Sequence, residues 1–103
     1  MTAKEIQEAV IVKVALSADG VNGREQVIRM AQAIGDALEG SKLGEYDGWE
    51  VRGRAAHIYV YGPSADALLS LIQPVLSGIG SDLSGIVIRR YGAPGAREVQ
   101  SGF

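Results

Sequence analysis

The stretch Arg54-Ala-Ala-His-Ile-Tyr-Val-Tyr-Gly-Pro63 decides the fold, because its central side chains alternate between aliphatic and polar or aromatic types with a period of two. Such alternation is typical of a β-strand with one buried face and one open face. The alternation divides the strand into a buried pair, Ile58 and Val60, and an open set, His57, Tyr59 and Tyr61. The open set contains the only histidine of the chain.

The N-terminal half adds one strand and one helix to this pattern. Ala9 to Leu16 is rich in β-branched residues and places Val10, Val12 and Val14 on one face, which predicts a half-buried strand. After a polar loop, Asn22 is a candidate helix cap, and the helix is expected to end near Gly40. Its apolar stripe is Val27, Ile28, Ala31, Ile34 and Leu38.

The rest of the chain adds two more strands and a second helix to the opening stretch. Trp49 to Arg52 is expected to form a hairpin with the opening stretch, and Ser64 to cap a second helix that bends at Pro74. The apolar stripe of that helix is Leu68, Leu69, Ile72, Val75, Leu76 and Ile79. Ser84 to Tyr91 is predicted to be the last strand. On it, we expect Ile86 and Ile88 to face inward and Val87, Arg89 and Tyr91 outward.

The order strand, helix, strand, strand, helix, strand predicts an α+β fold of the ferredoxin-like βαββαβ type. We expect a four-stranded antiparallel sheet with both helices on one face. With 103 residues the chain has the length of one domain, residues 1–103. Residues 1–8 and 95–103 are expected to be loosely held, although the tail could add a short edge strand.

Composition disfavours several function classes. The formal charge of −2 offers no general attraction to nucleic acid or anionic lipid. The chain has no cysteine, and one histidine leaves metal binding dependent on carboxylates, so we expect neither a metal nor a cofactor. The longest apolar run, Ala9 to Val12, is too short for a membrane span, so no membrane association and a cytoplasmic location are expected.

The open face of the sheet is the candidate site. Aromatic and arginine side chains together are typical of protein interfaces. We expect binding through His57, Tyr59, Tyr61, Arg89, Tyr91 and Arg52. The resulting hypothesis is a non-catalytic binding protein that forms a homodimer or binds another protein, as an inhibitor, immunity protein or adaptor does. The alternative hypothesis is a small-molecule sensor or small enzyme with a pocket at this face.

Other motifs of the sequence are weaker indications of a function. Glu45, Asp47 and Glu50 lack the ligand spacing of a calcium loop, and Asp19 to Arg24 matches no phosphate-loop spacing. Gly23-Arg24 resembles part of the acylphosphatase pattern, but Trp49 to Gly53 has no asparagine to hold the attacking water. RNA-recognition modules also use aromatic residues of the third strand; the residues before Tyr59 depart from their consensus.

Four segments together resemble a group of small bacterial proteins with no assigned activity. They are Glu45-Tyr-Asp-Gly48, Tyr61-Gly-Pro-Ser-Ala-Asp66, Ile72-Gln-Pro-Val-Leu76 and Arg90-Tyr-Gly-Ala-Pro-Gly-Ala-Arg97. The resemblance spans about half of the chain and rests on turn glycines, prolines and helix positions. It implies a shared ferredoxin-like fold and carries no function.

Overall fold

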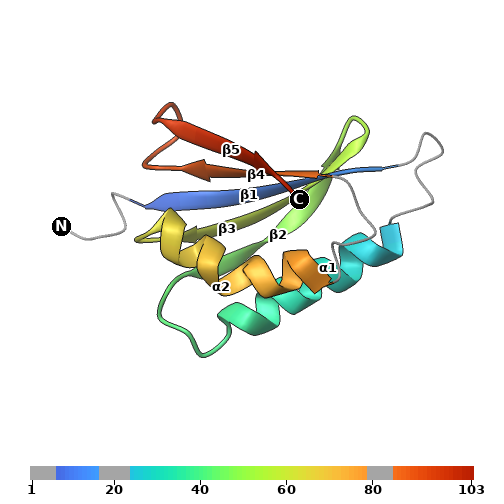
Figure 1. The fold of residues 1–103 in the computed structure, drawn as a ribbon, viewed down its shortest axis with the longest axis horizontal. Helices are drawn as coiled ribbons and strands as arrows, with labels where there is room; N and C mark the ends of the chain where they lie inside the picture. The colour runs from blue at the N-terminus through green and yellow to red at the C-terminus, as the bar shows by residue number, and fades with distance from the viewer. Residues whose placement is uncertain (1–6, 17–23, 79–84) are drawn as a thin grey trace.

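The computed structural model describes residues 7–16, 24–78 and 85–103 (Figure 1). The described chain is an α+β structure with two helices and a five-stranded antiparallel sheet. Its elements, in chain order, are β1 (Glu8–Ala15), α1 (Arg24–Leu38), β2 (Glu45–Arg52), β3 (Ala55–Gly62), α2 (Ala65–Gly78), β4 (Gly85–Arg90) and β5 (Glu98–Gly102). In the described parts of the chain, neither helix has the length and apolar character needed to cross a membrane.

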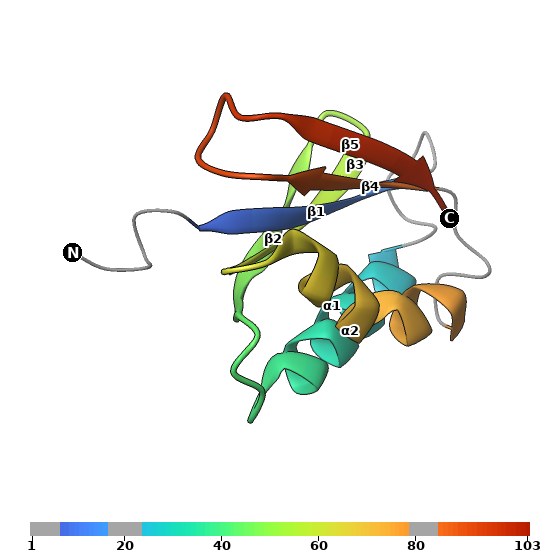
Figure 2. The same cartoon turned by 60° about the vertical axis from the view of Figure 1, so that its left-hand side comes forward.

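The strands lie in the order β2-β3-β1-β4-β5, and every neighbouring pair is antiparallel. Both helices lie on the same side of the sheet, so one sheet face is covered and the other is open (Figures 1 and 2). We call these the covered face and the open face. The strand β1 lies at the centre, between β3 and β4.

The core lies between the covered face and the helices. Val12 of β1 is paired with Ile58 of β3 and Val87 of β4, and all three side chains are buried. The helices contribute a buried stripe to the same cluster, namely Val27, Met30, Ala31, Ile34 and Leu38 from α1 and Ala65, Leu68, Ile72 and Leu76 from α2. Burying one large aliphatic side chain contributes about 1.5–3 kcal/mol to the free energy of unfolding. This burial is the main source of stability of the two-layer arrangement.

The turn and the bulge of the β2–β3 hairpin determine which side chains of β2 lie on the covered face. The turn consists of Gly53 and Arg54, and Gly53 has φ of +63°. Glycine at the first central position with positive φ fits a type II′ turn, whose twist matches that of the flanking strands. The β2 strand also shifts register between Tyr46 and Trp49, where Gly48 has φ of +93°. This bulge lets both Tyr46 and Trp49 pack against the core.

The predictions for β1, β3 and the helices are confirmed with small changes. Ile28, which the helical spacing placed in the apolar stripe of α1, is 46% exposed, and Met30 is buried instead. Pro74 lies inside α2, as expected, where it removes one backbone donor. The proposed Asn22 cap and Ile79 lie outside the described residues.

Two predictions for the C-terminal part are wrong. The sheet has five strands rather than four, because Glu98–Gly102 pairs with β4. The facing of β4 is also reversed: Val87 and Arg89 are opposite Val12 and Val10 on the covered face, so Ile86 lies on the open face. The physical reason is that Ile86, Val87 and Ile88 form a continuous apolar run, whose period cannot be read without the pairing to β1.

Candidate binding face

The open face consists of four rows of side chains that cross the strands. Strand register defines these rows, since directly paired residues of antiparallel strands project to the same face. The first row holds Glu45, Tyr61, Ala9, Arg90 and Glu98, and the second holds Tyr59, Ile11, Ile88 and Gln100. The third row holds Glu50, His57, Lys13, Ile86 and Gly102, and the fourth holds Arg52, Ala55 and Ala15.

Tyr59 is fixed on this face by its neighbour on β2. Its hydroxyl donates a hydrogen bond of 2.6 Å to Oε2 of Glu50. This bond to the carboxylate raises the pKa of Tyr59, and partial burial raises it further, while Arg52 opposes the shift. Tyr59 therefore remains a neutral hydrogen-bonding phenol near neutral pH, which suits it for contact rather than for proton abstraction.

His57 is held in its neutral form. Burial is the largest cause that lowers the pKa of His57, and the cations Lys13 and Arg52 lower it further against the opposing charge of Glu50. Its Nδ1 atom is buried and has no hydrogen-bond partner among the described residues. A neutral imidazole, with its ring 6.3 Å from that of Tyr59, forms part of the half-buried surface. The four rows contain no serine, threonine or cysteine that could act with it as a nucleophile.

Aliphatic side chains form the centre of the open face. Ile11 is half-buried between Tyr59 and Ile88, and Ile88 is only 8% exposed although α1 and α2, the helices of the described chain, both lie on the other side of the sheet. Ala9 in the first row is fully buried by its neighbours. Tyrosine, histidine and isoleucine side chains thus make one contiguous surface over β3, β1 and β4. A contiguous apolar surface of this kind is typical of interaction sites.

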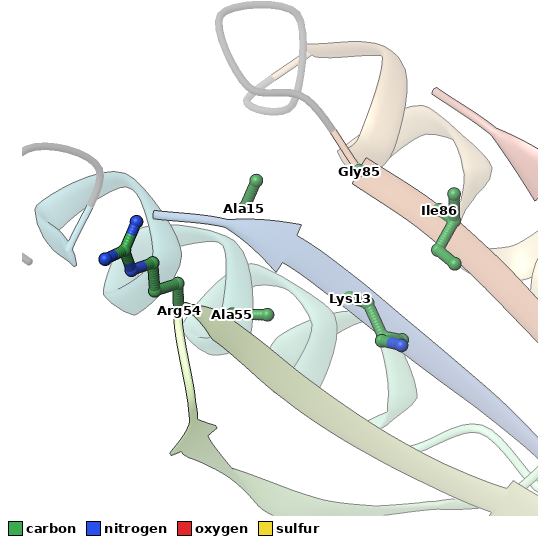
Figure 3. A pocket seen from close by; sticks show the side chains of 6 residues that line it. All are labelled: Lys13, Ala15, Arg54, Ala55, Gly85 and Ile86. Carbon is green, nitrogen blue, oxygen red and sulfur yellow. The ribbon is translucent and has the colours of Figure 1, made fainter. Parts of the chain in front are cut away.

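A hollow of about 460 Å³ opens at the fourth-row end of this surface (Figure 3). It exists because Ala15 and Ala55 are small, whereas the neighbouring third row carries the longer side chains of Lys13 and Ile86. Lys13 and Ile86 border the two alanines along the strands. Arg54 in the hairpin turn and Gly85 complete the lining. The hollow is apolar at its floor and has cationic groups at its border.

Charge is unevenly distributed along the strands of the open face. The first row carries carboxylates at both of its ends, Glu45 on β2 and Glu98 on β5, with Arg90 between them. The third and fourth rows carry the cations Lys13 and Arg52 and one carboxylate, Glu50, and Arg54 follows in the adjacent turn, so cations are in excess there. One end of the face is therefore acidic at its edges and the other end is basic.

Arg89 and Tyr91 were expected on the open face, and this placement is wrong. Arg89 is paired with Val10, which puts it on the covered face, and Tyr91 packs against the buried core. Both side chains bond Oδ1 of Asp66 in the first turn of α2, Arg89 Nη1 at 2.9 Å and the Tyr91 hydroxyl at 2.6 Å. The guanidinium of Arg97 lies 4.6 Å from the centre of the Tyr91 ring. This cluster joins α2 to β4.

The hydrogen bonds and charges of this cluster, which consists of Asp66, Arg89, Tyr91 and Arg97, shift the pKa values of Asp66 and Tyr91. The hydrogen bond from Tyr91 and the hydrogen bond and charge of Arg89 lower the pKa of Asp66, and the same bond raises the pKa of Tyr91. The start of α2 is also held by Ser64, whose Oγ accepts a bond from Ala67, and by Glu8, whose carboxylate accepts a bond of 2.7 Å from the Ala65 amide. These contacts have a structural role.

The structure thus brings His57, Tyr59, Tyr61 and Arg52 to one surface and separates Arg89 and Tyr91 from it. Sequence reasoning missed Ile86, Ile88 and Arg90 as members of the open face, since the reversed facing of β4 assigned them to the other side. Among the described residues, no three histidine, aspartate or glutamate side chains come close enough to hold a metal ion, and this holds for Glu45, Asp47 and Glu50.

Comparisons of the chain with protein-family models, with curated proteins and with solved structures give no significant match.

Proposed function

We propose that this chain is a non-catalytic binding protein that acts through the open face of its sheet. The observation that carries the proposal is the contiguous surface formed by Tyr59, Tyr61, Ile11 and Ile88, which neither of the two described helices covers. Aromatic rings provide a large contact area at low cost in side-chain entropy, and they are enriched at the centres of protein interfaces. The scaffold would be a ferredoxin-like βαββαβ unit to which β5 adds a fifth strand.

The experiment compares wild type with Tyr59→Ser/Tyr61→Ser by sedimentation over a wide concentration range. The double variant keeps the covered core, so its fold, checked by circular dichroism, should be retained. A matched control, Tyr91→Phe, alters a tyrosine on the other side of the sheet. Self-association, or capture of a protein partner, is expected for wild type and control and lost in the double variant. Equal behaviour of all three proteins contradicts the proposal.

The hollow supports a second candidate function, the binding of a small anionic molecule. Its floor is formed by Ala15 and Ala55, and Lys13 and Arg54 lie at its border. Such a site would suit a flat aromatic carboxylate, with its ring over the alanines and its charge near the cations. Benzoate should then raise the melting temperature of wild type with the logarithm of its concentration, and should not do so in Lys13→Gln/Arg54→Gln. No concentration-dependent rise in wild type contradicts this candidate.

A further inference from the structure

We infer that the partner of the open face is a second copy of the chain, related by a two-fold axis that lies in the interface and crosses the strands at a right angle. The inference rests on the proposed function and names its partner. Such an axis passes between the second and third rows. It brings the first row of one copy over the fourth row of the other, and the second row over the third.

Side-chain sizes are complementary under this operation. Tyr61 of the first row comes to lie over Ala55 of the fourth row of the second copy, because both belong to β3. Ala55 and Ala15 form the floor of the hollow, so the phenol ring of Tyr61 from the second copy has a space of matching position. On β4, Ile88 of one copy meets Ile86 of the other. A large residue thus faces a small one at Tyr61 and Ala55, and aliphatic side chains face each other on β4.

Charges are complementary as well. Glu45 and Arg52 are the first-row and fourth-row residues of β2, and both are exposed. The axis places Glu45 of each copy beside Arg52 of the other, which gives two symmetric ion pairs at one edge of the interface. Two symmetric like-charge approaches also result, between Glu50 of each copy and Asp47 of the other. They fall at the bulge on the edge strand, where solvent screens them.

The other two-fold arrangement, with its axis along the strands, is disfavoured. That axis exchanges β2 with β5 and leaves β1 over itself. It would bring Glu45 of each copy against Glu98 of the other, and Lys13 against Lys13. That arrangement gives three like-charge contacts and no ion pair among the described rows, whereas the axis that crosses the strands gives two ion pairs and two solvent-screened like-charge approaches. Charge therefore favours the axis that crosses the strands.

The absence of native cysteine allows a direct test by disulfide trapping. The variant Glu45→Cys/Arg52→Cys carries its two thiols at opposite ends of β2, roughly 23 Å apart at about 3.3 Å per residue. A disulfide requires Cα atoms within about 7 Å, so each bond in this variant must join two copies. The matched control, Glu45→Cys/Glu98→Cys, places thiols on the two sheet edges, four strand spacings or roughly 19 Å apart. All three positions are exposed, so folding should be preserved.

Under mild oxidation at low protein concentration, Glu45→Cys/Arg52→Cys is expected to become a covalent dimer that reduction reverses, and Glu45→Cys/Glu98→Cys to stay monomeric. Trapping of the control alone, or equal trapping of both variants, would overturn the inferred axis. If neither is trapped and wild type sediments as a monomer, the second copy is not the partner. The proposed function then still stands if Tyr59→Ser/Tyr61→Ser loses a foreign partner, so the two failures are distinguishable.

Discussion

The two faces of one sheet use neighbouring residues of the same strands for different purposes. On β3, Ile58 is fully buried beneath the helices, whereas Tyr59, the next residue, is half-buried on the open face and bonded to Glu50. On β1, the same contrast separates Val12 from Ile11. The central row of the covered face is aliphatic on β3, β1 and β4, while the open face mixes aromatic, aliphatic and charged side chains on the same strands. Stability and binding should therefore respond to different substitutions.

The largest expected difference concerns the free energy of unfolding. Ile58→Ala removes a fully buried side chain and should cost about 2–5 kcal/mol, because it leaves a cavity in the core. Ile86→Ala removes the same side chain from the open face, where it is half-buried, and should cost about 1 kcal/mol. Urea denaturation of both variants at low protein concentration measures the contrast. Equal losses would show that the open face is as much a core as the covered face.

The next effect concerns self-association. Glu45→Arg should weaken the dimer about tenfold, because each copy then places an arginine beside Arg52 of the other and two ion pairs become repulsions. The compensating change Arg52→Glu, added to Glu45→Arg, should restore the affinity. Sedimentation of the single and double variants gives the dissociation constants. A double variant that is no tighter than the single one would show that these two residues do not meet.

A smaller effect follows from the lowered pKa of His57. The unfolded chain titrates near the ordinary value of 6.5 and the folded chain below it, so between these values the unfolded state binds more protons. Stability should therefore fall as pH drops from 6.5 through the folded pKa, and should be unaffected above 6.5. His57 is the only histidine, so His57→Gln should flatten urea-derived stability over this range. An unchanged slope would contradict the lowered pKa.

The smallest effect is expected on the other side of the sheet, at Asp66. Its pKa is lowered below 3.8, chiefly by the Tyr91 hydroxyl, so this contribution to stability is present above 3.8 and is lost as pH falls through the folded pKa. Tyr91→Phe should thus lower the melting temperature slightly at neutral pH and lose this effect in acid, without altering self-association. A loss of the dimer in Tyr91→Phe would mean that this cluster belongs to the interface.

The sequence predicts the two faces well where alternation is strict and poorly where it is not. On β3, Ile58 and Val60 alternate with His57, Tyr59 and Tyr61, and the structure confirms the division. On β4, three successive aliphatic residues are compatible with either facing, and only the pairing of Val87 with Val12 decides it. The same ambiguity placed Arg89 and Tyr91 in the candidate site.

Other features depend on contacts that no local pattern contains. The tail Glu98–Gly102 has one large aliphatic residue, Val99, and becomes a strand because β4 offers it a free edge. The hollow over Ala15 and Ala55 arises where two strands and a turn bring small residues together, although these residues are far apart in the sequence. The row order that underlies the inferred dimer likewise requires the register of all five strands.

The central claim is that the open face closes on a second copy with Tyr61 over Ala55. Sedimentation equilibrium of wild type, Ala55→Tyr, Tyr61→Ala and the size swap Ala55→Tyr/Tyr61→Ala tests it most directly. A dimer is expected for wild type, a weaker dimer or a monomer for each single variant, and recovery of the dimer in the size swap, because each large residue again faces a small one. A wild type that remains monomeric at every concentration, or a size swap as weak as the single variants, would contradict the account.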